Sequence, residues 1–170
     1  MKIINREQND LFGELLCFAN DEGQPIFWGR QLKIPFGLQN ETDIIVGLDL
    51  YCYNKDFQSR WKPEKVETIV ADIYSQYQIF MNECKDIGDI IMQAIEEEGD
   101  EWDIEPIETK EKLYSQIQII QVDILKDSYV VSFALNDEEW AVVKRNKKDS
   151  PSYFYINPKK EVEFAQMDYR

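Results

Sequence analysis

Residues 113–143 read LYSQIQIIQVDILKDSYVVSFALNDEEWAVV, and this stretch decides the expected fold. The turn-forming triplets KDS and NDE divide it into three strand-like runs. In the middle run, positions 129, 131, 133 and 135 are apolar and share one face, because side chains alternate across a β-strand. The pattern predicts a meander of three strands, and the segment SYFYI at 152–156 is a candidate for one more.

The N-terminal third has a similar pattern. The run DLFGELLCFA at 10–19 is followed by NDEGQP at 20–25, which we expect to be a hairpin loop, and then by a second run that ends in QLKIPF at 31–36. A third run, TDIIVGLDLYCYN at 42–54, alternates apolar and polar residues in the manner of a half-buried strand. Strands are therefore expected within residues 10–53.

Between these two strand regions the apolar spacing changes to three and four residues, which predicts helix over 63–98. Pro63 suits the first helical position, and Gly99 suits the end. Asp86 and Gly88 interrupt the apolar stripe, so one long helix and two shorter helices both remain open.

The order strands, helix, strands predicts an α+β fold, in which an antiparallel sheet of about six strands carries one or two helices on one face. No repeat or linker divides the chain, so we expect a single domain over 1–170. Its parts are strands at 10–53, helices at 63–98, an acidic loop at 99–109 and strands at 113–156.

The charge is concentrated in one part of the chain. The net charge is -14, of which residues 1–62 contribute -2, residues 63–109 contribute -12 and residues 110–170 contribute 0. Such a chain opposes binding to a phosphate backbone, so we expect no nucleic-acid partner. No apolar run has the length of a signal peptide or a membrane span, so we expect a cytoplasmic protein without a membrane partner.

Several kinds of catalytic and metal site are excluded by composition. The chain has no histidine, which removes histidine-based nucleophile systems and histidine-ligated zinc. Its seven glycines form neither GxGxxG nor GxxxxGK[ST], the loops that bind phosphates. The three cysteines, Cys17, Cys52 and Cys84, are far apart and fit buried thiols. We therefore expect no enzyme activity, no cofactor and no metal, and the acidic run lacks the order of a calcium loop.

The candidate binding site is the acidic loop. Residues 96–108 read EEEGDEWDIEPIE and contain eight acids and no base. In one interpretation Trp102 and its neighbouring isoleucines hold a solvated loop against the domain. In the other, the tryptophan is an anchor surrounded by carboxylates that attract a basic partner. The residues expected to contact that partner are Glu97, Asp100, Glu101, Trp102, Asp103 and Glu105.

Two alternatives belong to other functional classes. A small-molecule or enzymatic pocket between sheet and helix could be lined by aromatic residues such as Trp28, Tyr53 and Trp61. A purely structural subunit would instead be an obligate oligomer.

The chain also resembles small bacterial α+β domains, some of which are immunity proteins of polymorphic toxin systems. The resemblance rests on FGEL at 12–15, WGRQLKIPF at 28–36, the central helix and the closing meander at 117–143. It implies a cytoplasmic protein that blocks the active surface of a toxin, and it assigns no role to any single residue.

Overall fold

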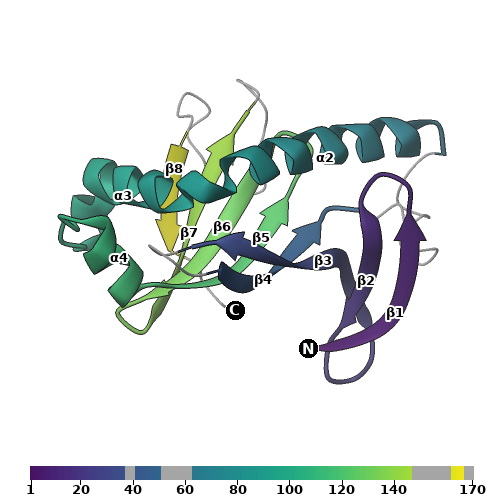
Figure 1. Ribbon diagram of the computed structural model, residues 1–170, viewed down its shortest axis with the longest axis horizontal. Helices are drawn as coiled ribbons and strands as arrows, with labels where there is room; N and C mark the ends of the chain where they lie inside the picture. The colour runs from purple at the N-terminus through teal and green to yellow at the C-terminus, as the bar shows by residue number, and fades with distance from the viewer. Residues whose placement is uncertain (37–40, 51–62, 147–161, 167–170) are drawn as a thin grey trace.

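The computed structural model describes residues 1–36, 41–50, 63–146 and 162–166, which form one eight-stranded sheet and a set of helices (Figure 1). The strands are β1 (Lys2–Asn9), β2 (Gly13–Ala19), β3 (Pro25–Pro35), β4 (Glu41–Leu48), β5 (Gln118–Ile124), β6 (Ser128–Leu135), β7 (Glu138–Arg145) and β8 (Val162–Gln166). The helices are α2 (Pro63–Glu83), the short 3-10 helix η2 (Cys84–Asp86), α3 (Ile87–Glu98), the 3-10 turn η3 (Gly99–Trp102) and α4 (Lys110–Gln116).

The strands lie in the sheet in the order in which they occur in the chain. Every described neighbouring pair is antiparallel except β4 and β5, which run parallel from Ile45 opposite Gln121 to Leu48 opposite Ile124. A parallel neighbour requires a long crossover, and the chain between β4 and β5 contains the described helices. The α+β class is confirmed, and the sheet is mostly antiparallel with this one parallel junction.

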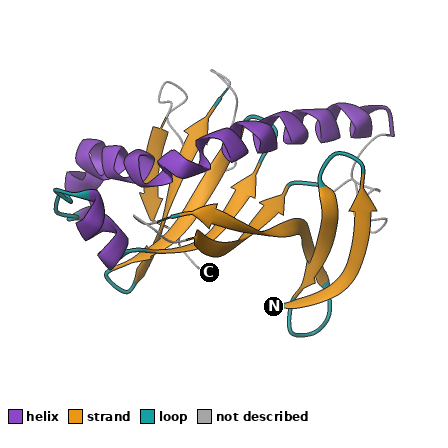
Figure 2. Ribbon diagram, in the orientation of Figure 1, coloured by secondary structure: helices purple, strands orange, loops and turns teal. Residues whose placement is uncertain are grey.

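The two long helices cover one face of the sheet (Figure 2). Pro63 begins α2 and Gly99 is the C-cap residue of α3, as the sequence predicts. The apolar stripe predicted over residues 63–98 is interrupted by η2 at Cys84–Asp86, so this region consists of two helices rather than one.

The main core lies between these helices and the sheet. It includes Ile73 and Phe80 of α2, Ile91 of α3, and Tyr129 and Phe133 of β6, each with no exposed surface. Full burial of one such side chain contributes roughly 1.5–3 kcal/mol to folding, so the apolar stripe predicted from spacing holds the helices on the sheet. A second, smaller cluster consists of Leu125, Val130, Ala141 and Val143.

A polar network joins the end of α2 to the C-terminal half of the sheet. The Tyr129 hydroxyl donates to Glu83 Oε2 at 2.6 Å, and Lys144 Nζ donates to Glu83 Oε1 at 2.6 Å. Because both carboxylate oxygens are used, the helix is fixed to β6 and β7 at the point where α2 ends.

Some boundaries differ from the expectation. Residues 113–116 were expected to begin a strand, but they belong to α4, because the Thr109 hydroxyl accepts from the Lys112 amide at 3.2 Å and caps a helix there. Strands β1 and β8 lie outside the expected strand regions, and the candidate strand at 152–156 lies outside the described residues.

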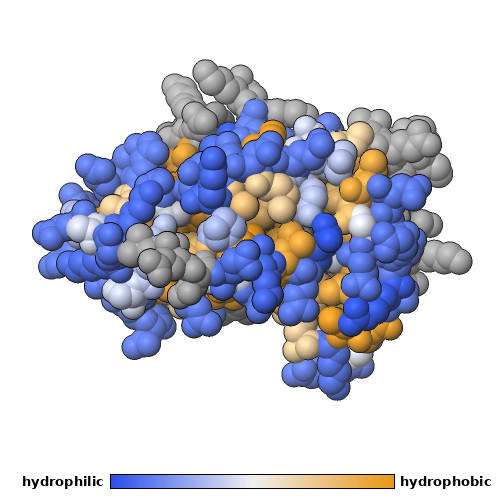
Figure 3. Space-filling model, viewed as in Figure 1, coloured by the Kyte–Doolittle hydropathy of each residue, from blue (hydrophilic) through white to orange (hydrophobic). Residues whose placement is uncertain are grey.

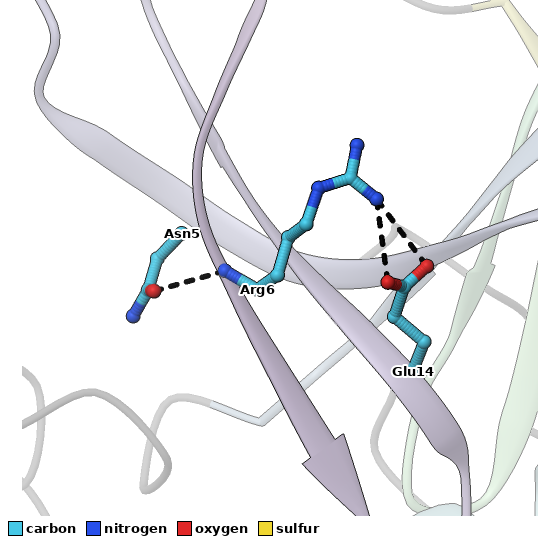
Figure 4. A network of polar contacts seen from close by, with 3 residues as sticks. All are labelled: Asn5, Arg6 and Glu14. Atoms are coloured by element: carbon cyan, nitrogen blue, oxygen red, sulfur yellow. Dashed lines mark hydrogen bonds and ion pairs between the residues drawn. The ribbon is translucent and has the colours of Figure 1, made fainter.

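Strand β1 forms one edge of the sheet and is held to β2 partly by polar contacts (Figure 4). Its Arg6 guanidinium contacts both carboxylate oxygens of Glu14 on β2 at 3.3 Å. The Arg6 amide donates to the side chain of Asn5 at 2.9 Å, and Asn5 lies on the side of β1 away from Glu14. The pairing register with β2 shifts between Ile3 and Asn5, which marks a bulge.

Candidate functional site: an acidic pole around Trp102

The predicted loop begins as a tight turn at the end of α3. The Gly99 amide donates to the carbonyl of Ile95, and the amide of Ile104 donates back to the carbonyl of Gly99 at 3.0 Å. Asp103, between η3 and Ile104, has a left-handed backbone with φ of 56°. These bonds fold residues 99–104 back on themselves, so this part of the acidic segment is an ordered turn.

Close packing explains why a glycine stands at the start of the turn. A Cβ atom at Gly99 would lie 2.8 Å from the carbonyl oxygen of Ile104, which is too close for any other residue without a backbone shift. Ile104 itself is buried and belongs to the main core. The turn is therefore anchored by its backbone and by one isoleucine.

Glu98 provides a second anchor. It is only 4 % exposed, and its Oε2 accepts the backbone amide of Phe164 on β8 at 3.2 Å. A buried carboxylate is stable only when it is hydrogen-bonded, so this residue ties the end of α3 to the sheet. It is the one buried acid of the run 96–108, and the prediction of the binding residues did not include it.

Trp102 lies at the surface of this anchored turn. Its indole is 39 % exposed and packs edge-to-face on Trp140, with ring centroids 5.9 Å apart and planes at 76°. Trp140 is buried, stacks on Phe164 at 5.0 Å and donates its Nε1 hydrogen to the carbonyl of Leu135. The turn thus combines a buried isoleucine, Ile104, with an accessible tryptophan, Trp102.

All six residues of the predicted contact set are exposed, and they lie on consecutive turns at one end of the molecule. We call this set the acidic pole: Glu97, Asp100, Glu101, Trp102, Asp103 and Glu105. Among the residues that the structure describes, no lysine or arginine forms an ion pair with any of its carboxylates. The nearby Lys110 of α4 binds Asp89 instead, at 2.7 Å.

The hydropathy of the surface agrees with this placement. The end of the molecule formed by α3 and α4 is mostly hydrophilic, whereas apolar surface is visible at the opposite end near β1 and β2 (Figure 3). Since no described lysine or arginine pairs with these exposed carboxylates, their negative potential extends into solvent and fades over roughly 8–10 Å at physiological salt.

The aromatic pocket proposed as an alternative is not assembled by the described residues. Trp28 is 5 % exposed and is part of the main core. Tyr53 and Trp61 lie outside the described residues.

The cysteines and metal ligands can be placed only in part. Cys17 and Cys84 are buried, as expected, and burial raises the pKa of both thiols. Cys52 lies outside the described residues. Within the described ranges, no group of three or more cysteine, aspartate or glutamate side chains is arranged to hold a metal ion. No described helix is both long and apolar enough to cross a membrane.

A pair of carboxylates, Asp49 and Asp123, lies outside the predicted site. Burial, with a smaller contribution from the charge of Asp123, raises the pKa of Asp49 to about 6. Burial also raises the pKa of Asp123, which accepts a hydrogen bond from Gln121 Nε2 at 2.6 Å. These acids meet at the parallel junction of β4 and β5, a long-range contact for which the sequence carries no local signal.

Comparison with known proteins gives no relative from which a function could be transferred. No family model matches the chain, and neither a curated protein nor a solved structure matches it.

Proposed function

We propose that this chain is a non-catalytic, cytoplasmic interaction protein of the immunity type, which binds a basic protein partner, such as a toxin domain, through the acidic pole. Trp102 is the apolar anchor of the contact. Glu97, Asp100, Glu101, Asp103 and Glu105 surround it and attract the basic surface of the partner.

The observation that carries this proposal is the half-exposed indole of Trp102 on an ordered acidic turn. Tryptophan is enriched among the residues that dominate binding energy, and such residues work best when they are held in place before binding. Here Trp140 supports the ring from below at 5.9 Å, and the bonds of Gly99 and Glu98 fix the turn. Surrounding carboxylates would speed the approach of a basic partner.

A toxin-type partner suits this arrangement because inhibition needs only steric cover of the active surface. An inhibitor of this kind requires no catalytic group, no cofactor and no metal of its own. Such an inhibitor is specific when its apolar anchor and its negative potential both fit the surface of a single target.

The test is co-expression and affinity capture with the products of adjacent genes, followed by binding kinetics on any captured protein. We expect Trp102→Ala to speed dissociation by about tenfold or more. We expect the triple variant Asp100→Lys, Glu101→Lys, Asp103→Lys to slow association, and the wild-type association rate to fall steeply as salt is raised.

A matched control separates the acidic pole from the total charge. The triple variant Glu7→Lys, Asp21→Lys, Glu22→Lys changes the net charge by the same amount, but its exposed sites lie on β1 and in the turn between β2 and β3. Leu11→Ala is the corresponding apolar control, since Leu11 is 45 % exposed at that end. Equal capture and equal rates for pole and control variants would overturn the proposed function.

A further inference from the structure

A cleft opens at the other end of the molecule, where β2 and β3 separate. The two strands pair from Ala19 opposite Pro25 to Leu16 opposite Gly29, and their pairing stops there. Strand β3 continues to Pro35, paired only with β4. The cleft has a volume of about 310 Å³ and is lined by Arg6, Glu14, Leu16, residues 30–33 and Asp43. We call it the fork.

The fork is built into the sheet by a pair of glycines. Gly29 and Gly47 stand opposite each other on β3 and β4. A Cβ atom at Gly29 would lie 2.5 Å from the carbonyl oxygen of Val46, so the two backbones approach too closely for a larger residue. Gly29 is also the last residue of β3 that pairs with β2, so the strands part where this close approach occurs.

The fork exposes an unpaired strand edge. Backbone amide and carbonyl groups of a strand point alternately to its two sides, so residues 30–33 direct some of these groups to β4 and the others into the fork. On that side no described strand pairs with them. An edge of this kind is a template for an added strand, and a cleft beside it gives room for the side chains of the added segment.

The charges around the fork differ in sign from the rest of the protein. Its lining holds three cations and two carboxylates, in a chain whose net charge is -14. Two of the cations are already engaged, because Arg6 binds Glu14 at 3.3 Å and Arg30 donates to the Tyr77 hydroxyl at 2.7 Å. Lys33 is exposed and forms no ion pair with a described residue.

We propose that the fork binds an extended peptide segment of a partner by strand addition to β3 at residues 30–33, with an acidic side chain of the peptide beside Lys33. Leu16 and Leu32 provide the apolar part of the lining. This site is separate from the acidic pole and has the opposite charge preference, so its test does not depend on the proposed function.

The experiment is a titration of the ¹⁵N-labelled full chain with blocked pentapeptides, followed by NMR. The probe is acetyl-Val-Glu-Val-Glu-Val-amide, and we expect a dissociation constant on the order of 0.1–1 mM. Amide signals of Gly13–Leu16 and of residues 30–33 should shift, and hydrogen exchange in 30–33 should slow. Lys33→Glu should weaken binding about tenfold, whereas Lys85→Glu, at an exposed lysine of η2, should leave it unchanged.

Three control ligands decide between modes of binding. Acetyl-Val-Lys-Val-Lys-Val-amide should bind at least about tenfold more weakly than the acidic probe. Acetyl-Val-Glu-Pro-Glu-Val-amide keeps the charges but lacks the central amide, so it too should bind more weakly. If it binds as well as the probe, or if free glutamate gives the same shifts, the fork is an anion site and strand addition is wrong. No shift in these segments at millimolar probe overturns the proposal.

Discussion

Strands β1 and β6 each have eight residues and belong to the same sheet, yet their environments are nearly opposite. In β1 seven residues are exposed and the last is half-buried, whereas in β6 all but one are buried. Strand β6 has a strand on each side and helices above it, whereas β1 has one neighbour among the described strands. One sheet thus contains a covered C-terminal half and an N-terminal half whose outer strand β1 is accessible, while β2, β3 and β4 add buried side chains to the main core.

The two proposed surfaces depend on these environments in different ways. The acidic pole stands on the covered half, where Trp140 and Phe164 give a surface residue a rigid support. The fork lies beside the accessible outer strand β1, where the pairing of β2 with β3 stops at Gly29. Substitutions beneath the acidic pole should therefore cost more stability than substitutions around the fork at the outer strand.

The largest loss of stability is expected for a residue that lies beneath the acidic pole. Trp140→Ala should lower the free energy of unfolding by about 3–5 kcal/mol, because it removes a buried indole and leaves a cavity. Trp102→Ala should cost only about 0.5–1.5 kcal/mol, since its ring is partly exposed and loses mainly one aromatic contact. Urea denaturation of both variants measures the contrast, and equal losses would mean that Trp102 is a core residue.

The junction between the halves should respond to pH. The pKa of Asp49 is raised from 3.8 to about 6 in the folded state, so folding retains a proton that the unfolded chain releases. The free energy of unfolding therefore falls as the pH rises from 3.8 through 6. Asp49→Asn should stabilise the protein by about 3 kcal/mol at pH 7.5 and by about half of that at pH 5.0.

The control for this prediction is Asp43→Asn, which removes the same charge from an exposed position on β4, the strand that Asp49 directly follows. Urea denaturation at both pH values gives the comparison. A gain in the free energy of unfolding for Asp49→Asn that matches the gain for Asp43→Asn, or that does not change with pH, would show that net charge rather than burial is the cause.

The N-terminal half of the sheet contains a close backbone contact at the glycine pair Gly29 and Gly47. Gly29→Ala should lower the free energy of unfolding by about 2–3 kcal/mol, because the added methyl group meets the Val46 carbonyl. Gly23→Ala, at a position with φ of 81° and open space around it, should cost only about 1 kcal/mol. Thermal unfolding of the two variants is the measurement. A loss at Gly29 no greater than at Gly23 would argue against a close approach at the fork.

The smallest effect is expected at the outer strand. The Arg6 and Glu14 side chains are 60 % and 55 % exposed, so their ion pair should have a coupling energy of about 0.5 kcal/mol. A double-mutant cycle with Arg6→Ala and Glu14→Ala measures it, and the coupling should decline in 0.5 M salt. A coupling energy well above 1 kcal/mol would mean that β1 is held to β2 more firmly than the exposure of these side chains indicates.

The covered half was largely predictable from the sequence, because burial imposes periodicity. The apolar stripe of α2 and α3 and the alternation of β6 are direct results of one-sided packing. Strand β1 has no such signal, since neither of its faces is buried and it is a strand only through its pairing with β2. Residues 113–116 were wrongly predicted because no glycine or proline separates them from the apolar run of β5, although Thr109 caps a helix there.

The candidate sites differ in the same way. The acidic pole was predictable because its carboxylates and Trp102 are consecutive in the chain. The fork was not, since Arg6, Lys33 and Asp43 come from three strands whose neighbours are set by pairing. The parallel contact of β4 with β5, which brings Asp49 close to Asp123, likewise depends on the crossover and not on local pattern.

The contact between Asn5 and the Arg6 amide has a consequence for behaviour at high concentration. Because the Asn5 side chain already accepts the outward-facing Arg6 amide, a second molecule has one donor fewer with which to extend the sheet. The bulge beside this contact also disturbs the regular strand spacing that stacked copies would need. We therefore expect the chain to resist fibre growth through its first strand, even though Ile3 and Ile4 are exposed there.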